Sequence, residues 1–239
     1  MNLYLAILLI FFLSSSVQGM TGFGSALVAM PLLSFFLDAR TAVPLCALNS
    51  IVITGFLLYS MHQHLDVKKI LPLCIAAIPG AILGAQVLRQ IDAGTFKLIL
   101  GLLLICYSSY TLIVSPLPRR LHPRWAYLAG FLSGSINSAF STGGPPTILY
   151  ATLNNWSKDE VKATLTGFFA FNSLLTVTTH YFLGFITRDV QFAFLASAGS
   201  VLLGTMTGSK LYSSVPHRVY LKITYLFLLI MGLTLAFAA

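Results

Sequence analysis

Apolar segments follow one another along almost the entire chain, and this pattern restricts the folds open to it. Hydrophobic residues make up 57% of the 239 positions and charged residues only 8%, whereas a soluble domain carries about 25% charged residues. A helix needs about 20 apolar residues to cross a bilayer. The sequence therefore predicts an all-α, polytopic integral membrane protein, with full crossings that begin near residues 41, 70, 97, 163, 190 and 219.

Two glycine-rich breaks interrupt the remaining, shorter apolar segments at matching places in the two halves of the chain. The first is Gly19-Met-Thr-Gly-Phe-Gly-Ser25 and the second is Ser141-Thr-Gly-Gly-Pro-Pro146. Unpaired backbone amides are not tolerated in lipid, so an irregular backbone at membrane depth is buried in protein or lines a watery cavity. Paired broken helices are typical of secondary transporters, which bind their substrate where the breaks meet.

The matching breaks belong to a longer internal duplication. Equivalent residues follow in the same order with small insertions: Phe12 and Phe131, Gly24 and Gly143, Asn49 and Asn172, Ser50 and Ser173, Gly80 and Gly204, Gly84 and Gly208. We therefore predict two transmembrane repeats, at residues 1–115 and 125–239, joined by a basic, proline-rich linker at 116–124.

The topology of each repeat depends on whether its broken segment crosses the membrane. If both breaks turn back as re-entrant hairpins, each repeat has about three crossings, and most of the 14 Lys and Arg residues fall on one face. That bias agrees with the positive-inside rule, and it favours inverted repeats with both termini on the outer face. If both segments cross instead, the basic residues divide about evenly and the halves are parallel.

The breaks themselves predict an anion site. A helix start exposes free N–H groups and the positive end of the helix dipole, so two facing starts would hold a small oxyanion without a buried Lys or Arg. The alternative is that the small residues only allow helices to pack closely, as we expect of the glycine pairs at 80 and 84 and at 204 and 208. The predicted substrate shell comprises Thr21, Gly22, Gly24, Ser25, Ser141, Thr142, Gly143 and Gly144.

Polar residues beside the breaks have two interpretations. Asn49 and Asn172 lie inside predicted spans, and Gln18 and Asn137 come just before the breaks. A polar side chain in a span must find partners, so these amides either line the cavity or brace the loops through interhelical hydrogen bonds. His180 lies well inside a span and either carries a proton or bonds a neighbouring carbonyl group.

Other classes of function find little support in the sequence. No Asp or Glu lies well within a predicted span, which argues against a carboxylate proton relay, and no nucleotide-binding loop occurs, which argues against ATP drive. The spans also lack a carboxylate pair, a His/Cys cluster and a Ser/His/Asp set, so we expect neither an enzyme nor a bound cofactor. The net charge of +8 arises in short loops and does not predict nucleic-acid binding. His62 and His64 beside Asp66 are expected in a solvated loop rather than a metal site. We expect the three cysteines to be small packing residues: Cys46, Cys74 and Cys106.

At the two breaks the chain resembles the sulfite exporter TauE/SafE family of membrane proteins. The run from Val17 to Leu33 is similar to the family's first repeat, and the run from Gly143 to Tyr150 is similar to its second. The resemblance covers nearly the whole chain. It implies secondary transport of small sulfur-containing anions such as sulfite or organosulfonates. Ser25 departs from the pattern, because family members often have glycine there.

We therefore expect a multi-pass protein of the cell membrane, the inner membrane in a bacterium, that moves a small anion by alternating access. Export is the default direction, since a potential of about 100 mV opposes anion entry by roughly 2.3 kcal/mol per charge. The alternatives are an anion channel, an uptake permease for organosulfonates coupled to an unidentified ion, and an assembly factor without transport activity. A homo-oligomer is left open.

Overall fold

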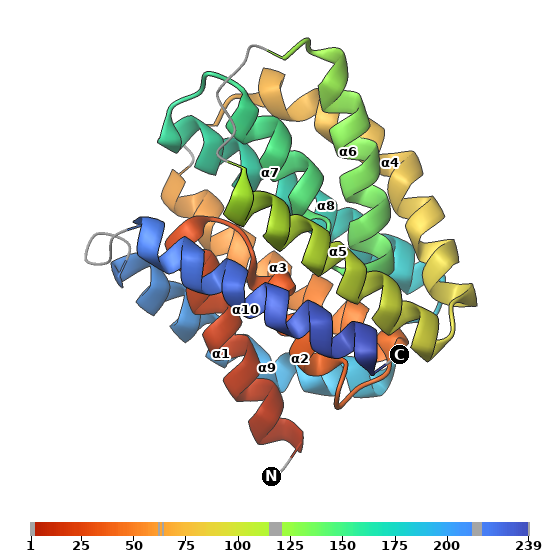
Figure 1. Ribbon diagram of the computed structural model, residues 1–239. Helices are drawn as coiled ribbons and strands as arrows, with labels where there is room; N and C mark the ends of the chain where they lie inside the picture. Colours follow the sequence, from red (N-terminus) through yellow and green to blue (C-terminus); the bar gives the residue numbers. More distant parts are fainter. Residues whose placement is uncertain (1–2, 62, 64, 115–120, 212–216, 239) are drawn as a thin grey trace.

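The structure is a computed structural model that describes residues 3–61, 63, 65–114, 121–211 and 217–238. All regular structure in these ranges is helical, which confirms the all-α prediction for them. Most of the predicted linker at 116–124, together with His62 and His64, lies outside the described residues. The helices, labelled in Figure 1, are α1 (Leu3–Thr21), α2 (Ser25–Leu33), α3 (Ala39–Met61), α4 (Val67–Gln90), α5 (Ala93–Ile113), α6 (Arg124–Phe140), α7 (Gly144–Leu153), α8 (Lys158–Phe182), α9 (Arg188–Leu211) and α10 (His217–Phe237).

Five of the described helices are long and apolar enough to cross a membrane, namely α1, α3, α4, α5 and α9. The chain is therefore an integral membrane protein. The expected crossing near residue 163 does form a helix, α8, but polar residues such as Asn172 and His180 lower its hydropathy and it is not among the five. The apolar stretch described in α10, Leu221–Phe237, is shorter than these five helices and is not among them. By contrast α1, expected as a shorter segment, has 19 residues and qualifies.

Polar caps fix where the helices begin. Asp66 accepts a hydrogen bond from the Lys68 backbone N–H at 3.0 Å, and Asp92 accepts one from Thr95 at 2.9 Å. Ser157 and Glu160 form a reciprocal capping box at the start of α8. Side-chain oxygens satisfy N–H groups that a helix leaves unpaired in its first turn. The sequence thus marks the aqueous ends of the helices as well as their apolar middles.

Three pairs of helices pack closely, α4 with α6, α1 with α9 and α5 with α10. Helices α3 and α8 contact each other, and they join the first two pairs through α9 and α4 (Figure 1). In α4, a Cβ atom at Gly80 would collide with the Phe131 carbonyl of α6. In α9, a Cβ atom at Gly204 would collide with the Phe12 carbonyl of α1. The predicted packing role of these glycines is therefore confirmed, because only a hydrogen at Cα allows such close backbone contact.

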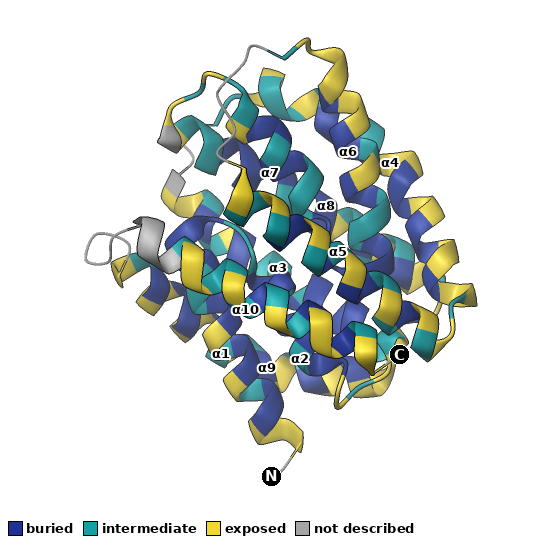
Figure 2. Cartoon of the chain, viewed as in Figure 1, coloured by how far each residue is buried: buried dark blue, intermediate teal, exposed yellow. Residues whose placement is uncertain are grey.

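Burial alternates across the outer helices (Figure 2). Large apolar side chains such as Leu71, Ile75 and Ile82 on α4 point away from the protein, while Leu73, Ala77 and Leu88 on the same helix are buried. An apolar outer surface of this kind suits contact with lipid tails.

Candidate functional site

Both predicted breaks interrupt the helical path. The first separates α1 from α2, with Gly22 at φ 84° and Gly24 at φ 98°. The second separates α6 from α7, and there Ser141 has φ 57°. A positive φ costs an L-residue roughly 1–2 kcal/mol and is free for glycine. The glycines of the first break therefore permit a backbone turn that other residues would resist.

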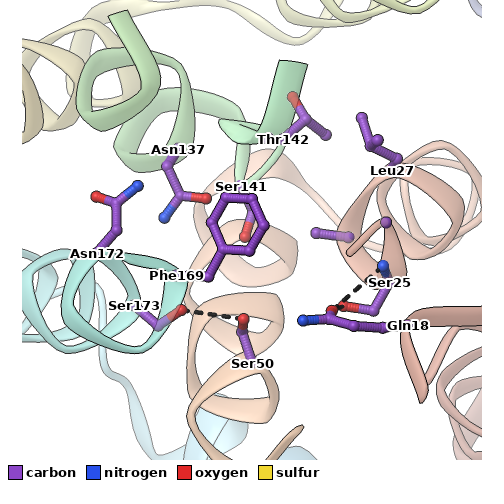
Figure 3. A pocket seen from close by; sticks show the side chains of 13 residues that line it. Gln18, Ser25, Leu27, Ser50, Asn137, Ser141, Thr142, Phe169, Asn172 and Ser173 are labelled. Carbon is purple, nitrogen blue, oxygen red and sulfur yellow. Dashed lines mark hydrogen bonds between the residues drawn. The ribbon is translucent and has the colours of Figure 1, made fainter. Parts of the chain in front are cut away.

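A small cavity of about 30 Å³ lies between the two breaks, and we call it the break cavity. A water molecule needs about 10–15 Å³ of such volume, so the space is constricted. Helices α1, α2, α3, α6, α7 and α8 and both breaks contribute to its lining (Figure 3): Gln18, Gly24, Ser25, Ala26, Leu27, Ser50, Asn137, Ser141, Thr142, Gly144, Phe169, Asn172 and Ser173. None of these residues is charged. The structure thus brings together five of the eight predicted shell residues.

Gln18 braces the first break. Its Oε1 accepts hydrogen bonds from the Ser25 backbone N–H, at 3.3 Å, and from the Ser25 hydroxyl. Thr21 Oγ1 donates to the Val17 carbonyl at 2.9 Å and accepts from the Phe23 backbone N–H at 3.2 Å. Thr21, a member of the predicted substrate shell, is therefore engaged in the turn and is not among the residues that line the break cavity.

Gly22 also lies outside the lining. A Cβ atom there would lie 2.8 Å from Cγ of Lys162, so the aliphatic stem of this lysine covers the outer side of the break. The prediction that Gly22 forms part of the substrate shell is not matched by its position, because this glycine faces α8 rather than the cavity.

The second break is anchored to α6. Ser133 Oγ donates to the Gly143 carbonyl, and a Cβ atom at Gly143 would collide with the Ser133 carbonyl and with Asn137. Gly143, a member of the predicted substrate shell, therefore packs against α6 and is not among the residues that line the break cavity. Asn137 Nδ2 donates to Thr176 Oγ1 at 3.0 Å, which links the same turn to α8.

The two helix starts differ in the donors they offer. The first-turn N–H groups of a helix have no acceptor within it, and α2 presents its first turn through Ala26 and Leu27, which line the cavity. In α7, Pro145 and Pro146 occupy the first turn, and proline has no N–H group. The second half must therefore contribute donors mainly through side chains.

Asn172 and Thr142 supply such donors. Asn172 is 1% exposed, and neither its amide nitrogen nor its amide oxygen has a partner among the described residues. The hydroxyl of Thr142, 2% exposed, is also unpaired. Buried polar groups are nearly always hydrogen-bonded, and leaving one unsatisfied costs roughly 1–3 kcal/mol. Two such groups beside one cavity are able to hydrogen-bond a polar ligand there.

Asn49, the residue equivalent to Asn172, has a different role. Its Nδ2 donates to the Leu45 carbonyl and to Ser197 Oγ, both at 3.0 Å. It is fully buried and does not line the break cavity. Of the two interpretations open for these amides, bracing applies to Asn49, which joins α3 to α9, and cavity lining applies to Asn172.

Several lining residues were not predicted. Ser50 and Ser173 are hydrogen-bonded to each other, with 3.0 Å between their hydroxyl oxygens, in the lower part of Figure 3. The repeated Asn-Ser dipeptide was a usable signal for them, since each serine follows an asparagine already singled out. Leu27 and Phe169 are apolar, and nothing in the sequence distinguishes them from ordinary core residues.

Other candidate groups lie outside the cavity lining. His180 is fully buried, and its Nε2 lies 2.9 Å from the Ser138 carbonyl, which matches the bonding interpretation. Cys46 and Cys74 are buried as predicted, but Cys106 is exposed and is not a packing residue. Within the described ranges no three His, Cys, Asp or Glu side chains are grouped as metal ligands.

A model of one protein family, described as sulfite exporter TauE/SafE, matches residues 7–235. No curated protein and no solved structure matches the chain.

Proposed function

Because the chain belongs to the sulfite exporter TauE/SafE family over residues 7–235, we propose that it exports a small sulfur-containing anion through the break cavity. The family is one of membrane transporters and not of enzymes, so transport of sulfur anions is the starting point. Sulfite and small organosulfonates are the proposed substrates. The proposal adds the site, the direction and the mechanism to what membership alone implies.

The observation that carries the proposal is the pair of unpaired donors beside the break cavity. An oxyanion would accept hydrogen bonds from Asn172 Nδ2 and from the Thr142 hydroxyl. First-turn N–H groups of α2, at the lining residues Ala26 and Leu27, would add to them. All of these donors are neutral. Hydrogen bonds to a charged group are worth about 1.5–3 kcal/mol each, so a few of them bind an anion without holding it as firmly as a buried cation would.

We further propose that the two halves are inverted repeats that alternate around this cavity. The glycine contacts support the relation, since Gly80 meets the Phe131 carbonyl and Gly204 meets the Phe12 carbonyl. The two glycines are equivalent in sequence, and so are the two phenylalanines, so the same contact occurs once in each direction between the halves. The contact between Ser50 and Ser173 joins equivalent residues to each other, as expected close to a two-fold axis. Alternating access by rocking of one repeat against the other would then expose the cavity to each face in turn.

Transport by purified protein in liposomes tests the proposal. We expect saturable flux of radiolabelled sulfite, or of one small organosulfonate, and counterflow driven by unlabelled substrate. A channel would instead show unsaturable flux and single-channel currents. Correctly folded protein that moves none of a panel of sulfur anions would refute the proposed function.

Export under physiological conditions is tested by imposing a membrane potential. A potential of about 100 mV corresponds to roughly a fifty-fold gradient for a monovalent anion. If flux follows this potential without a coupled ion, the direction is export. Uptake against the potential that requires a second ion would contradict it and favour the permease alternative.

A further inference from the structure

A second and much larger cavity of about 1010 Å³ lies between the α5–α10 pair and helices α2, α6 and α7. We call it the cleft. On one side it is lined by residues 103–114 in α5 and its C-cap and by residues 221–225 in α10, and on the other by residues such as Ile136, Pro146 and Thr152. Leu27 and Thr142 line both the cleft and the break cavity. These two side chains are therefore the partition between the two spaces.

The packing of α5 and α10 explains why the cleft exists. The two helices cross closely at Gly101 and Gly232, where a Cβ atom on either would lie within 2.9 Å of the other residue's carbonyl oxygen. Near its beginning, α5 is attached to the end of α6 by the stacked rings of Phe96 and Phe140, 5.1 Å between centroids. The cleft is lined only by the later half of α5. The α5–α10 pair thus contacts the rest of the protein near the beginning of α5, and the cleft separates it from the other helices along the later half of α5.

Polar groups of the cleft lie where the later half of α5 faces the first turns of α10. Tyr107 and Tyr225 meet edge to face at 5.8 Å, and Tyr110, Thr111 and the exposed Lys222 lie in the same lining. A lysine is costly in hydrocarbon. At an aqueous mouth it would instead raise the local concentration of an anion. Under the re-entrant topology, the end that carries Lys222 would belong to the face with most of the Lys and Arg residues, which the positive-inside rule assigns to the cytoplasm.

We propose that the cleft is a water-filled vestibule that conducts the anion from the basic face to the break cavity, and that Leu27 and Thr142 form its inner gate. This inference rests on the proposed function for the identity of the solute, but the vestibule itself is testable without transport. Leu27, 4% exposed, blocks the passage with an apolar side chain, while the unpaired Thr142 hydroxyl is available to an anion that passes.

Cys106 provides a native probe of the vestibule. It lines the cleft and is exposed, whereas Cys46 and Cys74 are buried. A charged, membrane-impermeant methanethiosulfonate reagent should label Cys106 in proteoliposomes from one side, as one mass increment that the Cys106→Ala variant lacks. If Cys106 reacts only with a lipid-soluble maleimide, the cleft is filled by lipid and the proposal fails, whether or not the protein transports sulfite.

The gate is tested with a second thiol placed beyond it. In the Cys106→Ala background, Ser50→Cys introduces a thiol into the lining of the break cavity. We expect the charged reagent to label this thiol several-fold faster when Leu27 is also changed to alanine. Leu33→Ala is the matched control, because Leu33 is fully buried on the same helix and lines neither cavity. Equal labelling rates in the Leu27→Ala and Leu33→Ala variants would overturn the assignment of Leu27 to the gate.

Discussion

Ser173 Oγ donates a hydrogen bond to Ser50 Oγ at 3.0 Å, and the two serines occupy equivalent positions in the two halves of the chain. They join α8 to α3 directly beside the break cavity. Each serine follows one of the paired asparagines, Asn49 and Asn172. The two asparagines nevertheless differ in their hydrogen bonds, since the Asn49 amide is bonded and the Asn172 amide has no partner among the described residues. The same sequence signal thus yields a brace in one half and an unpaired amide in the other.

That difference predicts opposite phenotypes for two matched variants. Asn172→Ala should reduce transport strongly and change thermal stability little, because the amide that it removes has no partner. Asn49→Ala should destabilise the protein by about 1–3 kcal/mol, because it removes the buried hydrogen bonds of the amide with the Leu45 carbonyl and with Ser197. Flux in liposomes and thermal unfolding in detergent separate the two effects. Equal losses of stability in both variants would contradict the assignment.

The first break predicts a local backbone requirement. Gly24→Ala should reduce flux, because φ 98° at this residue costs an alanine roughly 1–2 kcal/mol and distorts the start of α2. Gly184→Ala is the matched control, since Gly184 has φ 76°, has open space around its Cα and lies away from the cavity. Flux is normalised to inserted protein. The site assignment is wrong if both variants transport equally well.

Close helix packing predicts which glycines tolerate a methyl group. Gly208→Ala should lower the thermal midpoint, because the new Cβ would collide with the Ser16 carbonyl of α1. Gly199→Ala on the same helix meets nothing within 4 Å, and it should leave the midpoint unchanged or raise it through the better helix propensity of alanine, worth about 1 kcal/mol. An equal decrease in the two variants would argue against the packing contact.

The Lys69–Glu160 ion pair, 2.6 Å between Nζ and Oε1, predicts an acid-sensitive link between α4 and α8. The hydrogen bond from Lys69, with further bonds from Ser157, lowers the pKa of Glu160 to about 2 from an ordinary 4.5. A lowered pKa stabilises the fold above about pH 4.5, and this contribution is lost as the pH falls toward 2. The thermal midpoint should therefore decrease on acidification, and less so in Glu160→Gln than in the neighbouring control Asp159→Asn. Identical pH profiles would exclude the link.

The sequence was sufficient for the features that depend on backbone chemistry alone. Gly-Gly-Pro-Pro cannot continue a helix, and the glycine pairs at 80 and 84 and at 204 and 208 have the spacing of one helix face, so the breaks and the close contacts were predictable. Residues whose side chains bond the backbone within a turn were harder to predict. Thr21 was expected to face a ligand, but its hydroxyl bonds the Val17 carbonyl and the Phe23 N–H within the break.

Features that depend on tertiary contacts were not predictable. Asn49 is a bracing residue because it bonds Ser197, which is 148 residues away in the chain. The two residues come into contact only through the packing of α9 on α3. The gate position of Leu27 likewise depends on where the α5–α10 pair stands relative to α2. Neither arrangement leaves a local pattern, because a buried asparagine or leucine looks the same in sequence whatever it contacts.

The most direct test of the central claim is the thermal shift of purified protein with sulfite. A ligand at about one hundred times its dissociation constant stabilises the protein that binds it by about 2.7 kcal/mol. We predict a saturable increase in the melting temperature of the native protein, and little or no increase when Asn172→Ala and Thr142→Val are combined. An equal increase in the native protein and the double variant would contradict binding at the break cavity.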